Sequence, residues 1–165
     1  MLLLSNGNVL ITWISDGQDG SYWGVYGKII DASGSTVKSE FRVNEYTTDY
    51  QVNNKMLLLS NGNILITWTS DGAQDGSGRG VYGKIIDAKG NIVKSEFRLN
   101  DYTEGMQAYP GMLLLSNGNV LINWNSYGQD GSNSGVYVKV IDASGNVVKS
   151  EFQINEYIYY DQIDG

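Results

Sequence analysis

Apolar and polar positions in the first 44 residues follow the two-residue period of β-strands. Residues 2–4 are a continuous apolar run, and residues 9–13 are β-branched or aromatic at alternate positions. Residues 25–30 form a third apolar stretch, and residues 37–44 alternate between apolar or small side chains and charged or amide ones. No part of the chain keeps a helical period. The pattern predicts four strands and no helix.

Turn residues separate these four strands. Asn6-Gly7 favours the two positive φ angles of a two-residue hairpin. Residues 15–24 are polar and rich in glycine, which predicts a loop between the second and third strands. Residues 31–34 predict a tight turn before the fourth strand. Short turns between consecutive strands imply antiparallel pairing.

The same unit occurs three times along the chain. The sequence MLLLSNGN begins at Met1, Met56 and Met112, and the tryptophan of the second strand recurs at positions 13, 68 and 124. With Ala73 set aside as an insertion, 36 of 44 positions are identical between the first two units. Self-similarity at this period indicates a repeat architecture. The prediction is a single repeat domain, 1–165, with units 1–55, 56–111 and 112–165.

Polarity rises in order across each unit, from a wholly apolar first strand to a half-charged fourth strand. In a propeller blade the first strand lines the crowded axis, both faces pack on neighbouring blades, and the fourth strand lies at the rim. The predicted fold class is all-β, with three four-stranded antiparallel repeats as β-propeller blades. A β-trefoil or a β-prism, which also repeat three times, are the alternatives.

Three blades do not close a ring, because propellers typically need about four to eight. An open arc leaves two large apolar blade faces in water. The joining segment after the third unit could lead into the first strand of another copy, as Gly111 leads into Met112. The hypothesis is therefore a head-to-tail homodimer, each chain supplying half of a six-bladed ring.

The amino-acid composition excludes or disfavours several classes of binding partner and of chemical site. The chain has 18 acidic and 11 basic residues, for a formal charge of -7, which disfavours nucleic acid and anionic membranes. It has no cysteine and no histidine, which excludes thiolate metal sites and Ser-His-acid catalysis. No apolar stretch approaches the roughly 20 residues of a membrane span, and no signal peptide is visible. No membrane insertion is expected, and a secretion signal would lie outside this chain.

Candidate ligand contacts gather in the loop between the second and third strands, which shares one end of a propeller with the joining segments. Each copy of this loop carries a Gln-Asp-Gly-Ser sequence followed two residues later by a variable position. The predicted ligand-binding residues are Gln18, Asp19, Trp23, Gln74, Asp75, Arg79, Gln129 and Asp130.

Three interpretations of this loop remain open. The aspartates could hold the loop shape by accepting backbone N–H groups, as in Asx-turns. A calcium site is less favoured, because the D-x-[DN]-x-[DN]-G spacing is absent and Tyr127 replaces the equivalent of Asp16. A carbohydrate site would combine the Gln and Asp groups with an aromatic platform, for which Trp23 is the best candidate because it is not repeated. No cofactor and no bound metal are otherwise expected.

The repeated side chains have a structural interpretation. Trp13, Trp68 and Trp124 are identical in every unit and are expected in the core between blades. The charged positions of the fourth strand are expected to form a solvated outer edge. Near-identical repeats yield equivalent sites rather than one place with different catalytic roles, so the chain is not expected to be an enzyme.

The stretch W-x-S-x-G-Q-D-G-S-x-x-G-V-Y-G-K, followed by D-A-S-G and E-F-R-V-N, resembles the repeat of very large bacterial surface and RTX-associated proteins. The resemblance covers nearly the whole chain, with departures at Tyr127, Val138 and Gln153. It implies propeller-like blades in a secreted or cell-surface, adhesin-type protein, without a catalytic set. The leading functional hypothesis is a non-catalytic module for binding or adhesion. A lectin that binds glycans at the loop end and a purely structural scaffold are the alternatives.

Overall fold

The computed structural model describes residues 1–163, which form three separate four-stranded sheets. We name these sheets blade 1, blade 2 and blade 3. Blade 1 contains β1 (Leu2–Leu3), β2 (Val9–Asp16), β3 (Trp23–Ile30) and β4 (Thr36–Arg42). Blade 2 contains β5 (Gln51–Leu58), β6 (Ile64–Ser70), β7 (Gly80–Ile86) and β8 (Ile92–Arg98). Blade 3 contains β9 (Gln107–Leu114), β10 (Val120–Tyr127), β11 (Ser134–Ile141) and β12 (Val147–Gln153).

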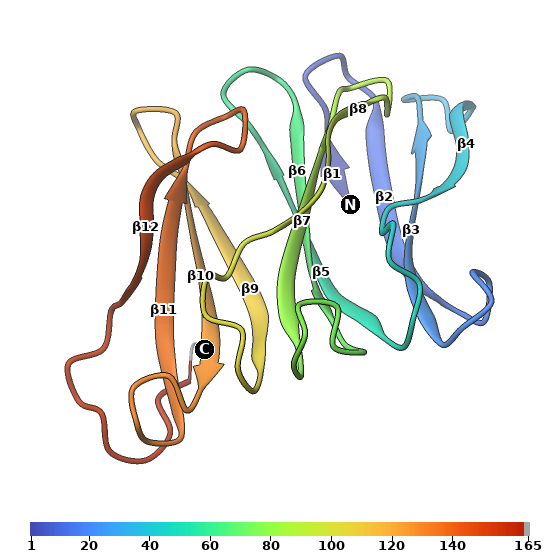
Figure 1. The fold of residues 1–165 in the computed structure, drawn as a ribbon. Coiled ribbons are helices and arrows are strands. Elements are labelled where there is room, and N and C mark those ends of the chain that lie inside the picture. The colour runs from blue at the N-terminus through green and yellow to red at the C-terminus, as the bar shows by residue number, and fades with distance from the viewer. Residues whose placement is uncertain (164–165) are drawn as a thin grey trace.

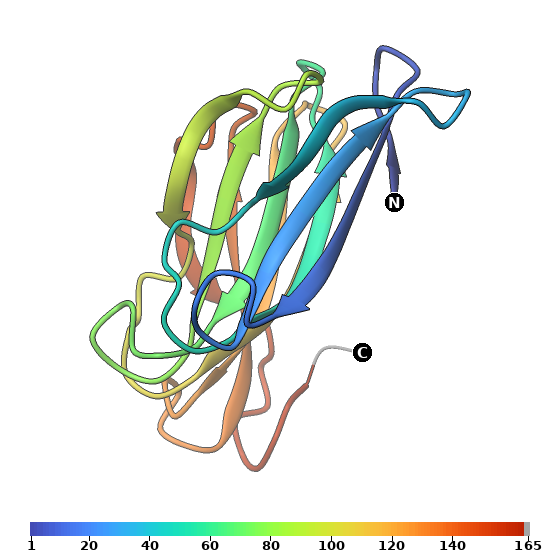
Figure 2. The same cartoon turned by 90° about the vertical axis from the view of Figure 1, so that its right-hand side faces the viewer.

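Every blade is an antiparallel meander in which strand order follows sequence order. The three blades stand side by side in Figure 1 and follow one another as layers in Figure 2, with blade 1 nearest the viewer. This arrangement confirms the predicted all-β class and the three four-stranded repeats. Within residues 1–163 there is no helix long and apolar enough to cross a bilayer.

The turns lie where the sequence predicts them, but the Asn6-Gly7 hairpin is not the predicted two-residue turn, because Gly7 has a positive φ and Asn6 does not. Gly7 has a φ of 83° and closes the hairpin by donating its N–H to the Leu4 carbonyl at 3.0 Å. Asp31 organises the turn before β4, because its Oδ1 accepts the backbone N–H groups of Ser33 and Ser35, each at 2.9 Å. Local hydrogen bonds therefore stabilise these turns, and the Asn6 side chain adds a contact with blade 2 by donating to the Ala88 carbonyl at 3.2 Å.

The hydrophobic core lies between blades rather than within them. One cluster joins residues such as Leu10 and Ile29 of blade 1 to Ile66 and Trp68 of blade 2. A second cluster repeats the arrangement between blades 2 and 3, with Leu65, Ile85, Ile122 and Trp124 among its members. Blade 2 thus contributes one face to its interface with blade 1 and the opposite face to its interface with blade 3, as the period-two pattern requires.

The innermost strands extend further back along the chain than the apolar sequence indicated. β5 begins at Gln51 and β9 at Gln107, so each uses residues of the preceding joining segment as well as the repeated Met-Leu-Leu run. Each contains a bulge, at which Asn53 (φ 56°) and Tyr109 (φ 62°) take left-handed conformations. In contrast, β1 pairs with β2 only at Leu2 and Leu3.

The outer strand of each blade does more than face solvent. Lys38 of β4 donates to the carbonyl of Gly90 in blade 2 at 2.6 Å, and Lys94 of β8 donates to that of Gly145 in blade 3 at 2.5 Å. The prediction of a merely solvated edge is therefore incomplete, because these lysines fasten one blade to the turn of the next.

The three repeated tryptophans differ in burial. Trp68 and Trp124 are completely buried between blades, whereas Trp13 is only half-buried. The difference follows from position: the face of blade 1 that carries Trp13 has no neighbouring blade among the described residues. Identity of sequence in the three units therefore does not give identity of environment.

Candidate binding site at the blade ends

The loops between second and third strands meet the joining segments at one end of the molecule, the lower end in Figure 1. Ser21 of the first loop accepts the backbone N–H of Asp49 at 3.0 Å, and Ser77 accepts that of Gly105 at 3.2 Å. These contacts bring residues about thirty positions apart in sequence onto one surface, which we call the loop end.

The repeated glutamines and aspartates of the loops hold each blade together. Asp19, Asp75 and Asp130 accept the N–H of the serine two residues further on, at 3.2, 3.3 and 3.0 Å, as the Asx-turn interpretation predicts. The glutamine before each aspartate donates to a glutamate on the outer strand of its own blade; the pairs are Gln18 with Glu40, Gln74 with Glu96 and Gln129 with Glu151. Their role as ligand contacts stays a prediction.

Among residues 1–163, no three acidic side chains converge as a metal site would need. The aspartate of each Gln-Asp-Gly-Ser loop instead accepts hydrogen bonds from a backbone N–H group and from a side-chain amide of the same blade, which is an asparagine in blades 1 and 2 and Gln153 in blade 3.

Trp23 lies at the edge of a cavity in blade 1. The sequence predicts it in a loop, but β2 and β3 continue further than expected, and Trp23 is the first residue of β3, paired with Asp16. Together with Ile14, these two residues line a cavity of about 280 Å³. Trp23 remains 43% exposed, which is high for so large an aromatic side chain.

Two tyrosines complete an aromatic cluster around Trp23. Tyr50, from the joining segment that precedes β5, meets the Trp23 ring edge-on at 5.4 Å between centroids. Tyr22 stacks on Tyr50 at 4.8 Å with an interplanar angle of 18°. The sequence could not place Tyr50 beside Trp23, because the contact depends on how blade 2 packs on blade 1. The outcome is a partly exposed aromatic surface beside one carboxylate.

The equivalent position in blade 2 carries an ion pair instead. Arg79 replaces Trp23 and its Nε lies 2.9 Å from the Oδ2 of Asp71, the counterpart of Asp16. Gly78 replaces Tyr22, and a Cβ at Gly78 would lie 2.0 Å from the carbonyl oxygen of Gly105. Blade 2 therefore cannot carry the aromatic cluster without moving its backbone.

Blade 3 has a smaller cavity at the same position. Tyr127 and Ser134, the counterparts of Asp16 and Trp23, line a space of about 100 Å³ together with Met106 and Ile163. The N–H of Ser134 donates to Asp161 at 3.2 Å. The three blades thus present three different chemistries at one repeated position: an aromatic cavity, an ion pair and a mixed pocket.

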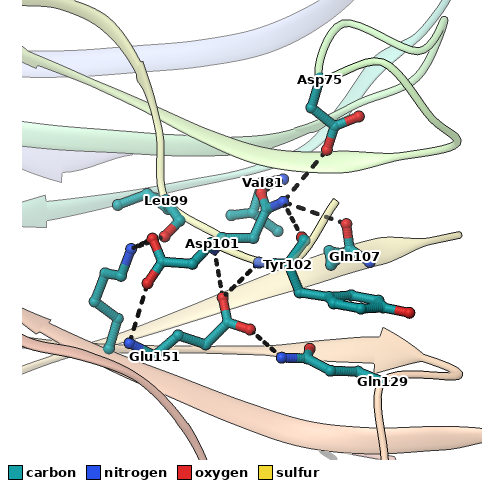
Figure 3. A network of polar contacts seen from close by, with 10 residues as sticks. Asp75, Val81, Leu99, Asp101, Tyr102, Gln107, Gln129 and Glu151 are labelled. Atoms are coloured by element: carbon teal, nitrogen blue, oxygen red, sulfur yellow. Dashed lines mark hydrogen bonds and ion pairs between the residues drawn. The ribbon is translucent and has the colours of Figure 1, made fainter. Parts of the chain in front are cut away.

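A network of buried side-chain amides stabilises the loop end, and the sequence-based predictions did not include it. Asn100 is 1% exposed; its Oδ1 accepts the Val81 N–H at 2.8 Å, and its Nδ2 donates to the Tyr102 carbonyl at 2.8 Å and to Gln107 at 3.2 Å. Figure 3 shows Val81, Tyr102 and Gln107 around this centre. A signal was present in the sequence, because each joining segment keeps an asparagine and a glutamine seven residues apart: Asn44 with Gln51, Asn100 with Gln107 and Asn155 with Gln162.

Ion pairs link the joining segments to the following blade. Asp101 accepts from the buried Lys139 at 2.6 Å, and Glu151 accepts the backbone N–H of Asp101 at 2.5 Å (Figure 3). Partial burial raises the pKa of Asp101, but the hydrogen bond and charge of Lys139 outweigh this effect, so the net pKa lies below its ordinary value of 3.8. The pKa of Asp142 is likewise lowered by hydrogen bonds from the backbone and side chain of Asn146.

Acid should therefore destabilise the fold. A carboxyl group whose pKa is lower in the folded state contributes stability above its unfolded pKa, and this contribution is lost as pH falls through the folded pKa. We expect the free energy of unfolding, measured by urea denaturation, to be constant near neutral pH and to fall below about pH 4. Asp142→Asn should make this fall less steep, and an unchanged pH profile would contradict the assignment.

No known protein family matches the sequence, and no curated protein sequence matches it. Solved structures do resemble the fold. A protein of unknown function from Dyadobacter fermentans aligns with a TM-score of 0.65 and 12% identity over 94% of this chain and 40% of its own. An endo-arabinase from Bacteroides thetaiotaomicron aligns with a TM-score of 0.54 and 15% identity over 91% of this chain and 57% of its own.

A fucose lectin from Kordia zhangzhouensis, solved with methyl-fucoside, aligns with a TM-score of 0.50 and 14% identity over 94% of this chain and 96% of its own. This chain therefore spans 40% and 57% of the first two structures, and nearly the full length of the lectin chain. At these identities the likeness concerns the fold. The fold class is that of β-propeller blades, as the sequence predicts.

Proposed function

We propose that the chain is a non-catalytic carbohydrate-binding module whose ligand site is the cavity lined by Ile14, Asp16 and Trp23 at the end of blade 1. The observation that carries the proposal is the cluster of Trp23, Tyr50 and Tyr22 beside the Asp16 carboxylate. A sugar ring offers an apolar face that packs on an aromatic ring and hydroxyls that donate to a carboxylate. The cavity, at about 280 Å³, lies near the lower end of the size range of small-molecule sites, which suits a single sugar ring.

Binding rather than hydrolysis agrees with the residues of the cavity. Asp16 is the one ionisable side chain among those described as lining it. Glycoside hydrolysis typically needs two carboxyl groups roughly 5 to 9.5 Å apart, on either side of the scissile bond. One carboxylate and an aromatic surface can bind a sugar, but they do not supply the second carboxyl group that hydrolysis would need.

The solved structures support the choice of ligand class. A fucose lectin and an endo-arabinase share the blade fold, so fucosides and arabinose-containing glycans are the first ligands to test. We extend the proposal to adhesion at a bacterial cell surface, for which the support is the resemblance of the repeat to that of surface proteins. Self-association of the chain is a separate proposal that rests on the open blade faces.

The proposal predicts that Trp23→Ala will weaken glycan binding strongly. A glycan array identifies the ligand, and calorimetric titration with it, or with methyl-fucoside, measures the affinity. Loss of the indole platform should weaken binding by at least about tenfold, equivalent to about 1.4 kcal/mol. Asp16→Asn should weaken it as well, because a neutral amide accepts hydrogen bonds less strongly than a carboxylate.

Tyr127→Ala is the matched control, because Tyr127 is also an exposed aromatic residue at the loop end but belongs to blade 3. This variant should bind as the wild type does. A wild-type protein that binds no glycan, or a Trp23→Ala variant with unchanged affinity, would overturn the proposal.

A further inference from the structure

The two outward blade faces carry the same apolar residues as the inner faces but lack their cover. On blade 1, Ile11 is half-buried, whereas its counterparts Ile66 and Ile122 are fully buried. On blade 3, Leu121 is half-buried, whereas its counterparts Leu10 and Leu65 are fully buried. We define the open face of blade 1 by Val9, Ile11, Trp13 and Ile30, and the open face of blade 3 by Leu121, Val136, Val140 and Ile154.

The two open faces are the two halves of one interface. Inside the molecule, counterparts of the open face of blade 3 pack against counterparts of the open face of blade 1, once between blades 1 and 2 and once between blades 2 and 3. The residues exposed at the two ends are therefore those that the chain already uses twice to join one blade to another. A surface of this composition is suited to another copy of itself in head-to-tail order.

Hydrogen bonds at the inner interfaces repeat in the same way. Lys38 donates to Gly90 and Lys94 to Gly145 across the two interfaces. The third members of these sets are Lys149, on the outer strand of blade 3, and Gly34, in the turn of blade 1. A second copy placed head to tail would bring Lys149 of one chain to the Gly34 carbonyl of the other.

A buried lysine and an acidic residue form a second repeated contact. Lys84 pairs with Glu45 at 3.0 Å and Lys139 with Asp101 at 2.6 Å, and both lysine side chains are about 5% exposed or less. The third lysine, Lys28 of blade 1, is half-buried and has no carboxylate partner among residues 1–163. The matching acidic position is Glu156, after blade 3, so opposite charges stand at corresponding places of the two open faces.

The edge of β2 points to the same partner. β5 pairs along β6 as far as Ser70, but β1 pairs with β2 only at Val9 and Leu10, so β2 has no strand on that side from Ile11 to Asp16 within the described residues. The joining segment after blade 3 makes the same backbone hydrogen bond as the joining segment between blades 2 and 3. The Gln162 N–H donates to the Ser134 carbonyl at 2.7 Å, as the Gln107 N–H donates to the Arg79 carbonyl at 2.8 Å. The segment after blade 3 therefore has the backbone arrangement that the other joining segments have where they lead into β5 and β9.

We infer that a second copy of this chain covers both open faces, with blade 3 of each copy packed on blade 1 of the other. Two copies give six blades, within the usual range of about four to eight, whereas three copies would give nine. The contacts across the new interface repeat those of the inner interfaces, including Lys149 with the Gly34 carbonyl and Lys28 with Glu156.

Light scattering coupled to size-exclusion chromatography tests the inference on the full chain. The wild type should have a mass of about 36 kDa, twice 18.2 kDa. Ile11→Glu on one open face and Leu121→Glu on the other should each give a folded protein of 18.2 kDa, because a buried unpaired carboxylate opposes association. An equal mixture of the two variants should regain a species of twice that mass, with weaker association than the wild type. The intact blade 3 of one variant can pack on the intact blade 1 of the other, whereas the second interface carries both glutamates and stays open.

Val93→Glu is the control, because Val93 is an exposed residue of blade 2, whose two faces are both covered. This variant should keep the mass of the wild type, and circular dichroism should show that all variants are folded. A wild-type monomer would overturn the inference. So would a dimer that one of the two face variants leaves intact, because a face-to-face dimer uses the same surface of both copies. Glycan binding is measured separately and is not a readout of this experiment.

Discussion

Trp68→Ala should lower the free energy of unfolding by about 3–5 kcal/mol, whereas Trp13→Ala, at the equivalent position of blade 1, should cost less than half as much. Trp68 is completely buried between blades 1 and 2, and its removal leaves a large cavity in a core that cannot collapse without moving a whole sheet. Trp13 lies on the open face of blade 1 and is only half-buried.

The comparison should be made by urea denaturation in the Leu121→Glu background, in which no second copy can cover Trp13. Trp68→Phe is an informative companion, because the indole N–H of Trp68 is buried without a hydrogen-bond partner among the described residues. Phenylalanine keeps an aromatic ring and removes this unpaired donor, so its cost should be smaller than that of alanine. Equal losses at Trp68 and Trp13 would contradict the packing described for the two sites.

The contrast between the two tryptophans shows what a repeated sequence can and cannot predict. The strands, hairpins and blade architecture follow from local features: the two-residue period, the Asn-Gly turns and the rise in polarity across each unit. These features act within a few residues and are the same in every copy. The burial of a residue, however, depends on whether a neighbouring blade exists, which no local pattern records.

Some residues of the candidate site could likewise be predicted from the sequence, whereas others are identified only by the packing between blades. Trp23 was predicted from its absence in the other two units, and the structure places it at the rim of a cavity. Tyr50 was only one of many tyrosines in the joining segments, and its contact with Trp23 arises when blade 2 packs on blade 1. The Asp71–Arg79 ion pair was missed for a different reason, since its residues are eight positions apart in a loop whose conformation the sequence does not specify.

Asn100→Ala should lower the free energy of unfolding by about 2–4 kcal/mol, a large effect for the loss of one polar side chain. Asn100 follows the end of β8, and its side-chain oxygen, rather than a backbone carbonyl, accepts the N–H of Val81 in β7. Its loss would leave the buried N–H of Val81 without an acceptor, and the Tyr102 carbonyl and Gln107 Oε1 without a donor. A buried donor that loses its partner costs about 1–3 kcal/mol, which is more than the hydrogen bond itself contributes.

Asn155→Ala is the matched comparison, because Asn155 makes the same bonds to Val136, Tyr157 and Gln162 but is half-buried. Water can replace the lost partners there, so in the Leu121→Glu background its cost should be about 1 kcal/mol.

Asn100→Asp provides a second test. A carboxylate at this position keeps an acceptor for Val81 but stands beside Asp75, which lies 3.3 Å from the present amide. Burial and repulsion raise the pKa of the new carboxyl, so this variant should recover stability relative to the wild type as pH falls from 7 towards 5. Equal losses at positions 100 and 155, or a pH-independent Asn100→Asp variant, would show that the amide network does not hold the loop end in place.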